Sequence, residues 1–171
     1  VTDAQGCTLV DSSYLLQPND IVINMDTTNN LCFGQANGAL DITVTGGVGG
    51  YSYNWSTGAT TEDISNVPAG FYTVIVADAN GCLDVTNAPV TEPGSLILSL
   101  NIVDNACYGA CNGVVTTNVS GGTAPYSYGW STGDTVSVAS GLCEGTYQLQ
   151  VTDTNGCQVS DNNIQVLQGN P

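Results

Sequence analysis

The chain is a succession of short segments in which apolar and polar residues alternate. Aromatic residues occupy every second position of residues 51–55, and Leu40, Ile42 and Val44 alternate with polar residues in the same way. Because the side chains of a β-strand point alternately to its two faces, this pattern predicts strands with one buried face. No segment shows the apolar stripe of an amphipathic helix.

Turn-forming residues separate these segments. Gly-Gly pairs, a Pro-Ala-Gly segment at residues 68–70 and four Asn-Gly pairs lie between them. Gly and Asn adopt the positive φ that tight hairpins require. We expect one strand near each of these ranges, with a second set 75 residues further on: 20–25, 39–45, 51–56, 60–66, 71–78 and 82–91.

The second set follows from an internal repeat. Residues 32–82 and 107–157 are identical at 23 of 51 positions without a gap, and residues 1–7 match residues 76–82 at the same shift. We therefore expect a tandem array of small antiparallel β-sandwiches. Its parts are the terminal hairpin of a truncated preceding repeat (1–17), a first full repeat (18–93) and a second (94–171).

The charge balance excludes most chemistry. The 171 residues include no Lys, Arg or His but 15 Asp and Glu, so the net charge is −15. Without cations the chain cannot clamp phosphates, and without His or Lys it cannot form the usual nucleophilic triads, a Schiff base or a His-containing zinc site. We expect no enzyme, no nucleic-acid partner and, with no long apolar run, no membrane insertion in this segment.

Seven cysteines in a Gly-, Thr- and Asn-rich chain indicate extracellular disulfides. Cys111 and Cys143 of the second copy are replaced by Ala36 and Pro68 in the first. The two cysteines are thus gained or lost together, as disulfide partners are. We expect a bond between them.

The other pairings are less constrained. We favour Cys32 with Cys82 and Cys107 with Cys157, which leaves Cys7, whose equivalent partner falls outside this sequence. A strand of about 26 Å separates the positions of Cys143 and Cys157, however, whereas Cys107 lies only four residues from Cys111. A bridge between neighbouring repeats, such as Cys32 with Cys157, is the alternative.

Calcium is a second hypothesis, because oxygen ligands suit this ion. Asp78 and Asp153 recur in Asp-x-Asn-Gly hairpins, where capping of backbone amides explains them better. The remaining candidates are near the expected repeat junctions: Asp20, Asp26, Asp104 and Asn105. We expect no other cofactor.

Surface chemistry offers few further sites. Tyr51, Tyr53, Trp55 and Tyr72 fall on core faces, which leaves few exposed rings for sugar binding: Tyr14, Phe33, Phe71 and Tyr108. Covalent glycosylation is more plausible. Asn54 and Asn118 lie in N-x-[ST] sequons, and Thr135 follows Asp and precedes an aliphatic residue.

The repeated motifs resemble a known family. Cys-Phe-Gly, Gly-Gly, Tyr-Ser-Tyr-Asn-Trp-Ser-Thr-Gly, Pro-Ala-Gly-Phe-Tyr-Thr-Val and Val-Ala-Asp-Ala-Asn-Gly-Cys are similar to the SprB repeat of large surface adhesins from gliding Bacteroidota. The second copy, with Cys-Tyr-Gly-Ala-Cys-Asn-Gly, resembles the four-cysteine form. The closing Tyr-x-Val-x-Val-x-Asp-x-Asn-Gly segment also resembles PKD domains, which are immunoglobulin-like.

The resemblance implies a secreted stalk or filament on the bacterial outer surface, exported by the type IX route and linked in some cells to gliding motility. Its partners would be neighbouring repeats and, as an alternative, polysaccharide or other surface chains. A structural spacer needs no repeated exposed constellation beyond turn residues, and we find none. A carbohydrate- or protein-binding module is the alternative, and an enzyme is a distant third.

Overall fold

The computed structural model describes residues 1–2, 4–8, 10 and 17–169, and these form twelve β-strands and no helix. The first six strands are β1 (Val22–Thr28), β2 (Gly38–Thr45), β3 (Ser52–Trp55), β4 (Ile64–Val67), β5 (Gly70–Ala77) and β6 (Leu83–Val90). The other six are β7 (Ile97–Val103), β8 (Gly113–Ser120), β9 (Ser127–Trp130), β10 (Val138–Leu142), β11 (Gly145–Thr152) and β12 (Gln158–Val166).

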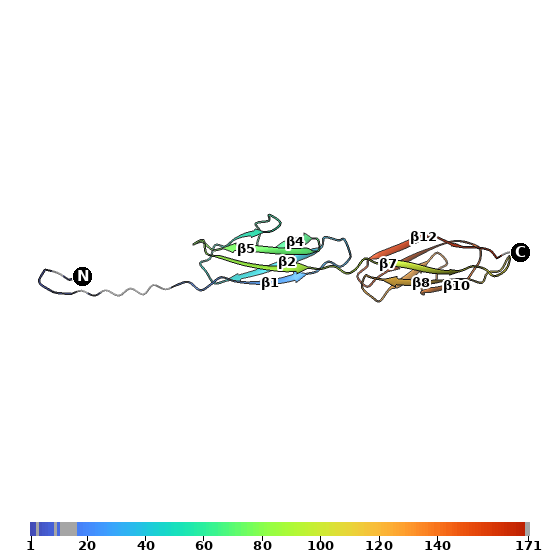
Figure 1. The fold of residues 1–171 in the computed structure, drawn as a ribbon, viewed down its shortest axis with the longest axis horizontal. Coiled ribbons are helices and arrows are strands. Elements are labelled where there is room, and N and C mark those ends of the chain that lie inside the picture. Colours follow the sequence, from blue (N-terminus) through green and yellow to red (C-terminus); the bar gives the residue numbers. More distant parts are fainter. Residues whose placement is uncertain (3, 9, 11–16, 170–171) are drawn as a thin grey trace.

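The strands form two sandwiches, which we call module 1 (β1–β6) and module 2 (β7–β12). In module 1 the sheet β1-β2-β4 packs on the sheet β3-β5-β6, and module 2 repeats this with β7-β8-β10 and β9-β11-β12. All pairings are antiparallel. The two sandwiches lie end to end (Figure 1). The chain is therefore an all-β protein of tandem antiparallel sandwiches, as the alternation and the internal repeat predict, with the immunoglobulin-like architecture that the resemblance to PKD domains implies.

Each module has its own hydrophobic core. The core of module 1 comprises Leu40, Ile42, Trp55, Ile64, Val67, Tyr72, Val74, Val76 and Val90. The core of module 2 comprises Val115, Trp130, Ala139, Leu142, Leu149, Val151, Ile164 and Val166. The two clusters share no residue. The expected core face of β5 is confirmed, because Val74 and Val76 are buried whereas Phe71 is exposed.

The two tryptophans show how closely the modules match. Trp55 and Trp130 are 2% and 5% exposed. Each indole N–H donates a 2.9 Å hydrogen bond to a loop carbonyl, that of Thr61 in module 1 and that of Val136 in module 2. Burial of a Trp requires such a partner for its N–H. The repeat therefore preserves both the ring's packing and its hydrogen bond.

The modules differ at one strand. A bulge in the β11–β12 pairing places Leu149 opposite Asp161 but Tyr147 opposite Ile164, so β12 holds one extra residue. Beyond the bulge, Val166 takes the place of Val90: each is buried, and each lies against the glycine that begins the second strand of its module, Gly113 or Gly38. The spacing of equivalent positions thus rises from 75 to 76 residues.

Most strand boundaries follow the predicted ranges, but β1 and β4 are shifted. The strand expected near residues 60–66 is β4, which runs only from Ile64 to Val67. The first strand was expected near residues 20–25, and β1 instead runs from Val22 to Thr28. The residues before it, Asn19 and Asp20, lie along the Gly46–Gly47 turn, where the Asn19 carbonyl accepts a 2.8 Å hydrogen bond from the Gly47 N–H. In the described part of the chain no helix has the length and apolar character needed to cross a bilayer.

Candidate functional site: the junction between the modules

Three structural parts meet where the modules adjoin. The first is the loop between β1 and β2, residues 29–37, which we call the β1–β2 loop. Its organiser is Asn30, a buried residue whose side-chain oxygen accepts hydrogen bonds from the backbone N–H groups of Asn37 (2.7 Å) and Gly38 (2.8 Å). The Asn30 N–H donates to the Thr91 carbonyl. The loop is thereby fixed to the start of the segment between β6 and β7, residues 91–96, which we call the linker.

The same linker is held a second time. The Glu92 side chain accepts a 2.7 Å hydrogen bond from the Gly34 N–H at the tip of the β1–β2 loop. An ionised acceptor makes this bond stronger than one between neutral groups. The loop and the linker therefore behave as one unit at the end of module 1.

The second part is the hairpin between β11 and β12, residues 153–157. Asp153 is buried, and its carboxylate accepts three hydrogen bonds from backbone N–H groups: Thr123 (2.8 Å), Asn155 (2.8 Å) and Cys157 (2.9 Å). Burial raises the pKa of this carboxyl, but the backbone N–H donors outweigh burial and hold the pKa below its ordinary value. The carboxylate thus joins the hairpin to the loop that follows β8.

Asp78 does the same in module 1. Its carboxylate accepts from Val48 N–H (2.9 Å), Asn80 N–H and Cys82 N–H, and the Val48 bond contributes most to lowering its pKa. The capping interpretation of these hairpin aspartates agrees with this geometry, because their oxygens face N–H donors.

The third part is the linker itself. After leaving β6 it passes against Gly121 and Gly122, which have φ of +74° and +59°. A Cβ at Gly121 would clash with the carbonyl oxygen of Ser95, and one at Gly122 would approach Leu96 and Asp153. The Gly122 N–H donates a 2.8 Å hydrogen bond to the Gly94 carbonyl. The Gly-Gly pair is therefore required where the chain enters a module.

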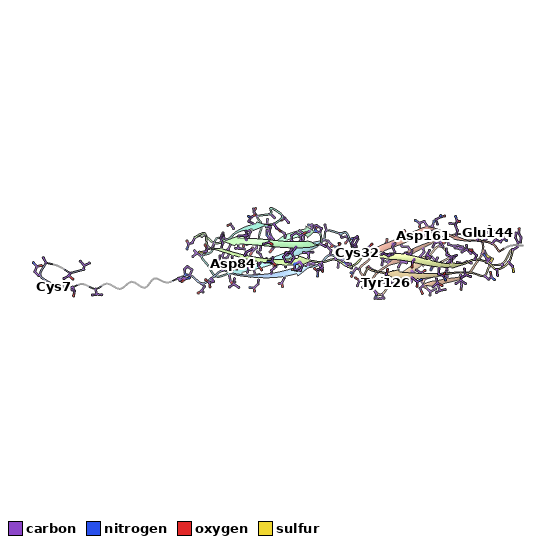
Figure 2. All side chains as sticks on the ribbon, in the orientation of Figure 1. Cys7, Cys32, Asp84, Tyr126, Glu144 and Asp161 are labelled. Atoms are coloured by element: carbon purple, nitrogen blue, oxygen red, sulfur yellow. A yellow bond between two sulfur atoms is a disulfide. The ribbon has the colours of Figure 1, made fainter. Side chains whose placement is uncertain are left out.

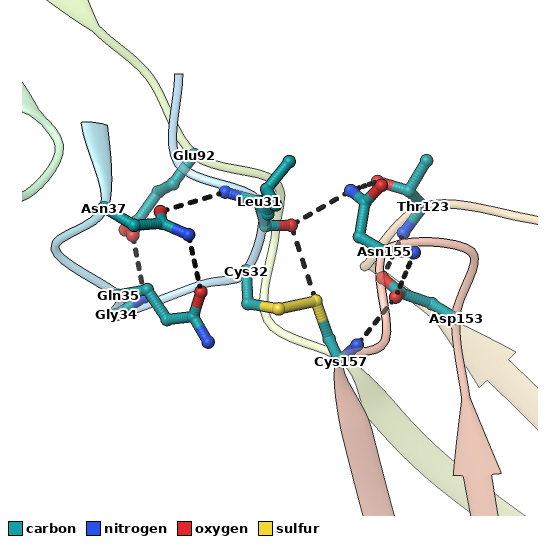
Figure 3. The surroundings of a disulfide bond; sticks show 10 residues. All are labelled: Leu31, Cys32, Gly34, Gln35, Asn37, Glu92, Thr123, Asp153, Asn155 and Cys157. Carbon is teal, nitrogen blue, oxygen red and sulfur yellow. Dashed lines mark hydrogen bonds between the residues drawn. A yellow bond between two sulfur atoms is a disulfide. The ribbon is translucent and has the colours of Figure 1, made fainter. Parts of the chain in front are cut away.

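A disulfide between Cys32 and Cys157 joins the β1–β2 loop to the hairpin (Figure 3). Their Cα atoms are 5.7 Å apart. Beside it, the Leu31 carbonyl accepts a 3.0 Å hydrogen bond from the side-chain amide of Asn155. That carbonyl also lies 3.4 Å from Cys157 Sγ, a packing contact because a disulfide sulfur has no hydrogen to donate. Figure 2 shows Cys32 between the two sandwiches.

The expected pairs Cys32–Cys82 and Cys107–Cys157 are wrong, and the alternative bridge between neighbouring repeats is present. The reason is the position of each cysteine within its module. Cys32 lies at the end from which the chain leaves module 1, whereas Cys82 follows a hairpin at the end where the chain enters it. A strand's length separates the two, and Cys82 and Cys107 are exposed thiols.

The second disulfide joins Cys111 to Cys143 within module 2, the pairing expected from their joint absence in the first copy. It connects the segment before β8 to the turn between β10 and β11. Cys7 belongs to the opening segment, where an isolated bridge pairs Thr2 with Thr8.

The four calcium candidates do not converge. Asp20 lies at the entry end of module 1, Asp26 is exposed in β1, and Asp104 and Asn105 lie at the far end of module 2. No group of three or more His, Cys, Asp or Glu residues in the described ranges is placed to hold a metal ion. Asn105 is buried, and its side chain organises the β7–β8 loop as Asn30 does in module 1.

The candidate surface residues are placed as follows. Phe33, Phe71 and Tyr108 are exposed, and Tyr14 lies outside the described residues. The three glycosylation candidates have exposed side chains: Asn54, Asn118 and Thr135. Sequence reasoning identified Asn155 only as a hairpin turn residue and did not single out Asn30, although the recurrence of Asn30 as Asn105 at a shift of 75 would have marked it.

Comparison with known proteins identifies the repeated unit. Residues 24–60 and 99–135 each match the model of the SprB repeat. Both copies of the internal repeat therefore contain a segment that matches the SprB repeat. Each match contains the organising Asn, the first junction cysteine, the Gly-Gly pair and the buried Trp. The loop that reaches the next module thus lies within the segment that matches the SprB repeat.

No curated protein matches the chain. Thirteen chains of solved structures do. One comes from a structure described as the structural basis for Dscam isoform specificity, with 15% sequence identity and a TM-score of 0.31. The match covers 78% of this chain and 41% of the other, so this chain spans less than half of that protein.

Proposed function

We propose that the two modules are spacer repeats of an extracellular adhesin or surface filament, positioned on the outer surface of a bacterial cell. The Cys32–Cys157 disulfide carries this proposal. A bond between the exit end of one module and the entry end of the next restricts bending at the linker. A chain built this way is long and stiff for the number of residues that it contains.

The disulfides and the family resemblance support this location. Structural disulfides form and persist in oxidising compartments outside the cytosol. Export by the type IX route and a role in gliding motility are what the family resemblance supports, and both belong to this proposal. The net charge of −15 keeps such chains apart from one another and from anionic membrane surfaces.

The junction has no side-chain ion pair to stabilise it, because the chain lacks Lys, Arg and His. Its contacts are the disulfide, the Asn155–Leu31 hydrogen bond and the packing of the linker on the Gly-Gly turn. We propose calcium only at junctions with further repeats, near Asp20, Asp104 and Asn105, and not at the junction described here.

A binding module is the second candidate, for polysaccharide or another surface chain. It is favoured by exposed Phe33 and its equivalent Tyr108, an aromatic pair that the repeat preserves. Phe33 lines the groove between the modules together with Cys32 and Cys157. Its position at the junction connects this aromatic, and with it the equivalent Tyr108, to the spacer function, so the carbohydrate alternative depends on the exposed Phe71.

Small-angle scattering of the chain tests the proposal. We expect two modules in line, with the same maximum dimension before and after addition of a chelator. A compact particle would contradict the spacer function, and a loss of stiffness on chelation would locate a calcium ion at the junction. Tight binding in a glycan array would favour the binding-module alternative.

A further inference from the structure

The two outer ends of the structure repeat the two halves of the junction. At the far end of module 2, the β7–β8 loop has the same architecture as the β1–β2 loop. The Asn105 side chain accepts hydrogen bonds from Asn112 N–H (2.8 Å) and Gly113 N–H (3.0 Å), and Ala106 N–H donates to the Asn112 side chain. Cys107 in this loop is the equivalent of Cys32 and is an exposed thiol.

The chain also leaves module 2 as it leaves module 1. The Gln168 side chain, with its amide oriented to satisfy both neighbours, accepts from Gly109 N–H (2.7 Å) and donates to Glu144 (2.6 Å). Gly109 is the equivalent of Gly34, which donates to Glu92 at the observed junction. The extra residue of β12 brings Gln168 into the position of Glu92, so the loop and the exit segment are preserved together.

The other half of the junction lies at the entry end of module 1. A groove there is lined by Asp20, Ile21, Gly47, Asp78, Cys82 and Leu83. The equivalent groove of module 2 is lined by Ser95, Leu96, Gly122, Cys157 and Gln158, and it also includes Cys32 and Phe33 of the preceding module. The two grooves are thus the same site, and only that of module 2 receives a β1–β2 loop.

The residues next to Cys82 and Cys107 are solvent-exposed. Leu83 is 69% exposed beside Cys82, and Tyr108 is 71% exposed beside Cys107. Both cysteines are themselves exposed, so each is accessible to another repeat.

We propose that the two ends are complementary docking surfaces for further repeats of the same kind. Cys107 bonds to the hairpin cysteine of a following repeat, and Cys82 bonds to the loop cysteine of a preceding repeat. Each bond forms when two thiols lose two protons and two electrons to an oxidising disulfide, which is reduced to two thiols. The result is an array in which a disulfide crosses every junction.

This inference rests on the proposed spacer function, since both require an array, and it adds the covalent partner of each exposed thiol. Two modules of this charge lack attractive ion pairs between them. A disulfide supplies attachment that neither salt nor dilution weakens. The heterologous, head-to-tail form of the contact permits unlimited extension along the chain.

The test is a tandem chain in which residues 1–170 are followed directly by residues 20–171 of a second copy. This join leaves as many residues between Val166 and the second copy's Val22 as lie between Val90 and Ile97. After oxidation with glutathione disulfide, peptide mapping by mass spectrometry under non-reducing conditions should find Cys107 of the first copy bonded to Cys82 of the second. Both thiols should become resistant to alkylation.

The matched control is the same tandem with Cys107→Ser in the first copy. We expect its second-copy Cys82 to be fully alkylated, while the Cys32–Cys157 bond forms in both copies. Alkylation of both thiols in the parent tandem, or their bonding to Cys7, would overturn the proposal, as would failure of the tandem to form its two Cys32–Cys157 bonds.

Scattering of the same tandem separates this inference from the proposed function. An extended tandem without the new bond would overturn the inference and leave the spacer function standing. A compact tandem would contradict the spacer function whatever its disulfides.

Discussion

Single residues at the ends of strands determine how each module is closed and how it meets its neighbour. Asp153 and Asp78 each hold a hairpin and a loop together through three backbone N–H groups. Asn30 and Asn105 do the same for the loop at the opposite end. These four side chains are short, buried and polar, and each provides hydrogen bonds that the sheets cannot.

We expect Asp153→Asn to lower the stability of module 2 at neutral pH and to flatten its acid dependence. The folded-state pKa of Asp153 lies below its ordinary value. The stabilisation is therefore present above the unfolded-state pKa of about 3.9 and is lost as the pH falls through the folded-state pKa. Thermal melts between pH 7 and pH 2, followed by Trp130 fluorescence in a Trp55→Phe background, would measure this.

Asp41→Asn is the matched control for that variant. Asp41 is exposed in mid-strand and lies opposite Asp26, so the substitution removes a repulsion between like charges. It should leave the acid dependence of module 2 unchanged. Equal acid profiles for the parent and Asp153→Asn would contradict the role assigned to the Asp153 carboxylate.

Gly121→Ala should destabilise module 2 by roughly 2 kcal/mol or more, since the residue has a positive φ and its new Cβ would meet the linker. Gly133→Ala is the control, because Gly133 also has a positive φ but open space around its Cβ position. Denaturant unfolding of both variants separates backbone strain from the clash. Equal losses of unfolding free energy in the two variants would show that the linker moves away from the new Cβ without destabilising module 2.

At the scale of elements, alternation predicted the strands well because each sheet has one buried and one exposed face. It identified the buried Trp of β3 and β9 and the core face of β5 for the same reason. The start of β1 was misplaced because Asn19 and Asp20 lie along the Gly-Gly turn, a contact between segments far apart in sequence. The bulge in β12 left no signal in a comparison made without gaps.

Of the two disulfides, one could be predicted from the sequence and the other could not. Cys111–Cys143 could be predicted because the second copy has both cysteines and the first has neither. The junction bond could not be fixed, because every repeat offers the same two cysteines. Only the placement of Cys32 at the exit end and Cys157 at the entry end decides between a bond within a module and one between modules.

Removal of the Cys111–Cys143 bond with Cys111→Ala and Cys143→Ala should destabilise module 2 by about 3 to 4 kcal/mol, as expected for the entropy of closing a loop of this size. The bond spans 32 residues of module 2. Module 1 serves as the internal control, because it has Ala36 and Pro68 at the equivalent positions. Denaturant unfolding followed separately at Trp130 and Trp55 measures the two modules, and a loss in both would contradict the assignment.

At the scale of the whole molecule, the Cys32–Cys157 bond controls the angle between the modules. We expect Cys32→Ser with Cys157→Ser to broaden the distribution of intermodule distances without lowering the melting temperature of either core. The cores share no residue, so neither depends on the junction for its packing. Single-molecule energy transfer between labels on β2 and β8 would report the distribution.

The variant that lacks Cys111 and Cys143 is the control for that experiment, because it loses a disulfide but keeps the junction. An unchanged distance distribution in the Cys32→Ser and Cys157→Ser variant would mean that the linker and the Asn155–Leu31 hydrogen bond fix the angle by themselves.

The position of the junction bond also determines how the chain responds to mechanical tension. Cys32 and Cys157 enclose a covalent loop of sequence separation 125, which contains every strand except β1 and β12. Once β1 and β12 have unfolded, a pull on the two termini is transmitted through the sulfur atoms. The enclosed strands then carry none of the load. The fully stretched path is then about 160 Å, against roughly 580 Å for the same chain without the bond.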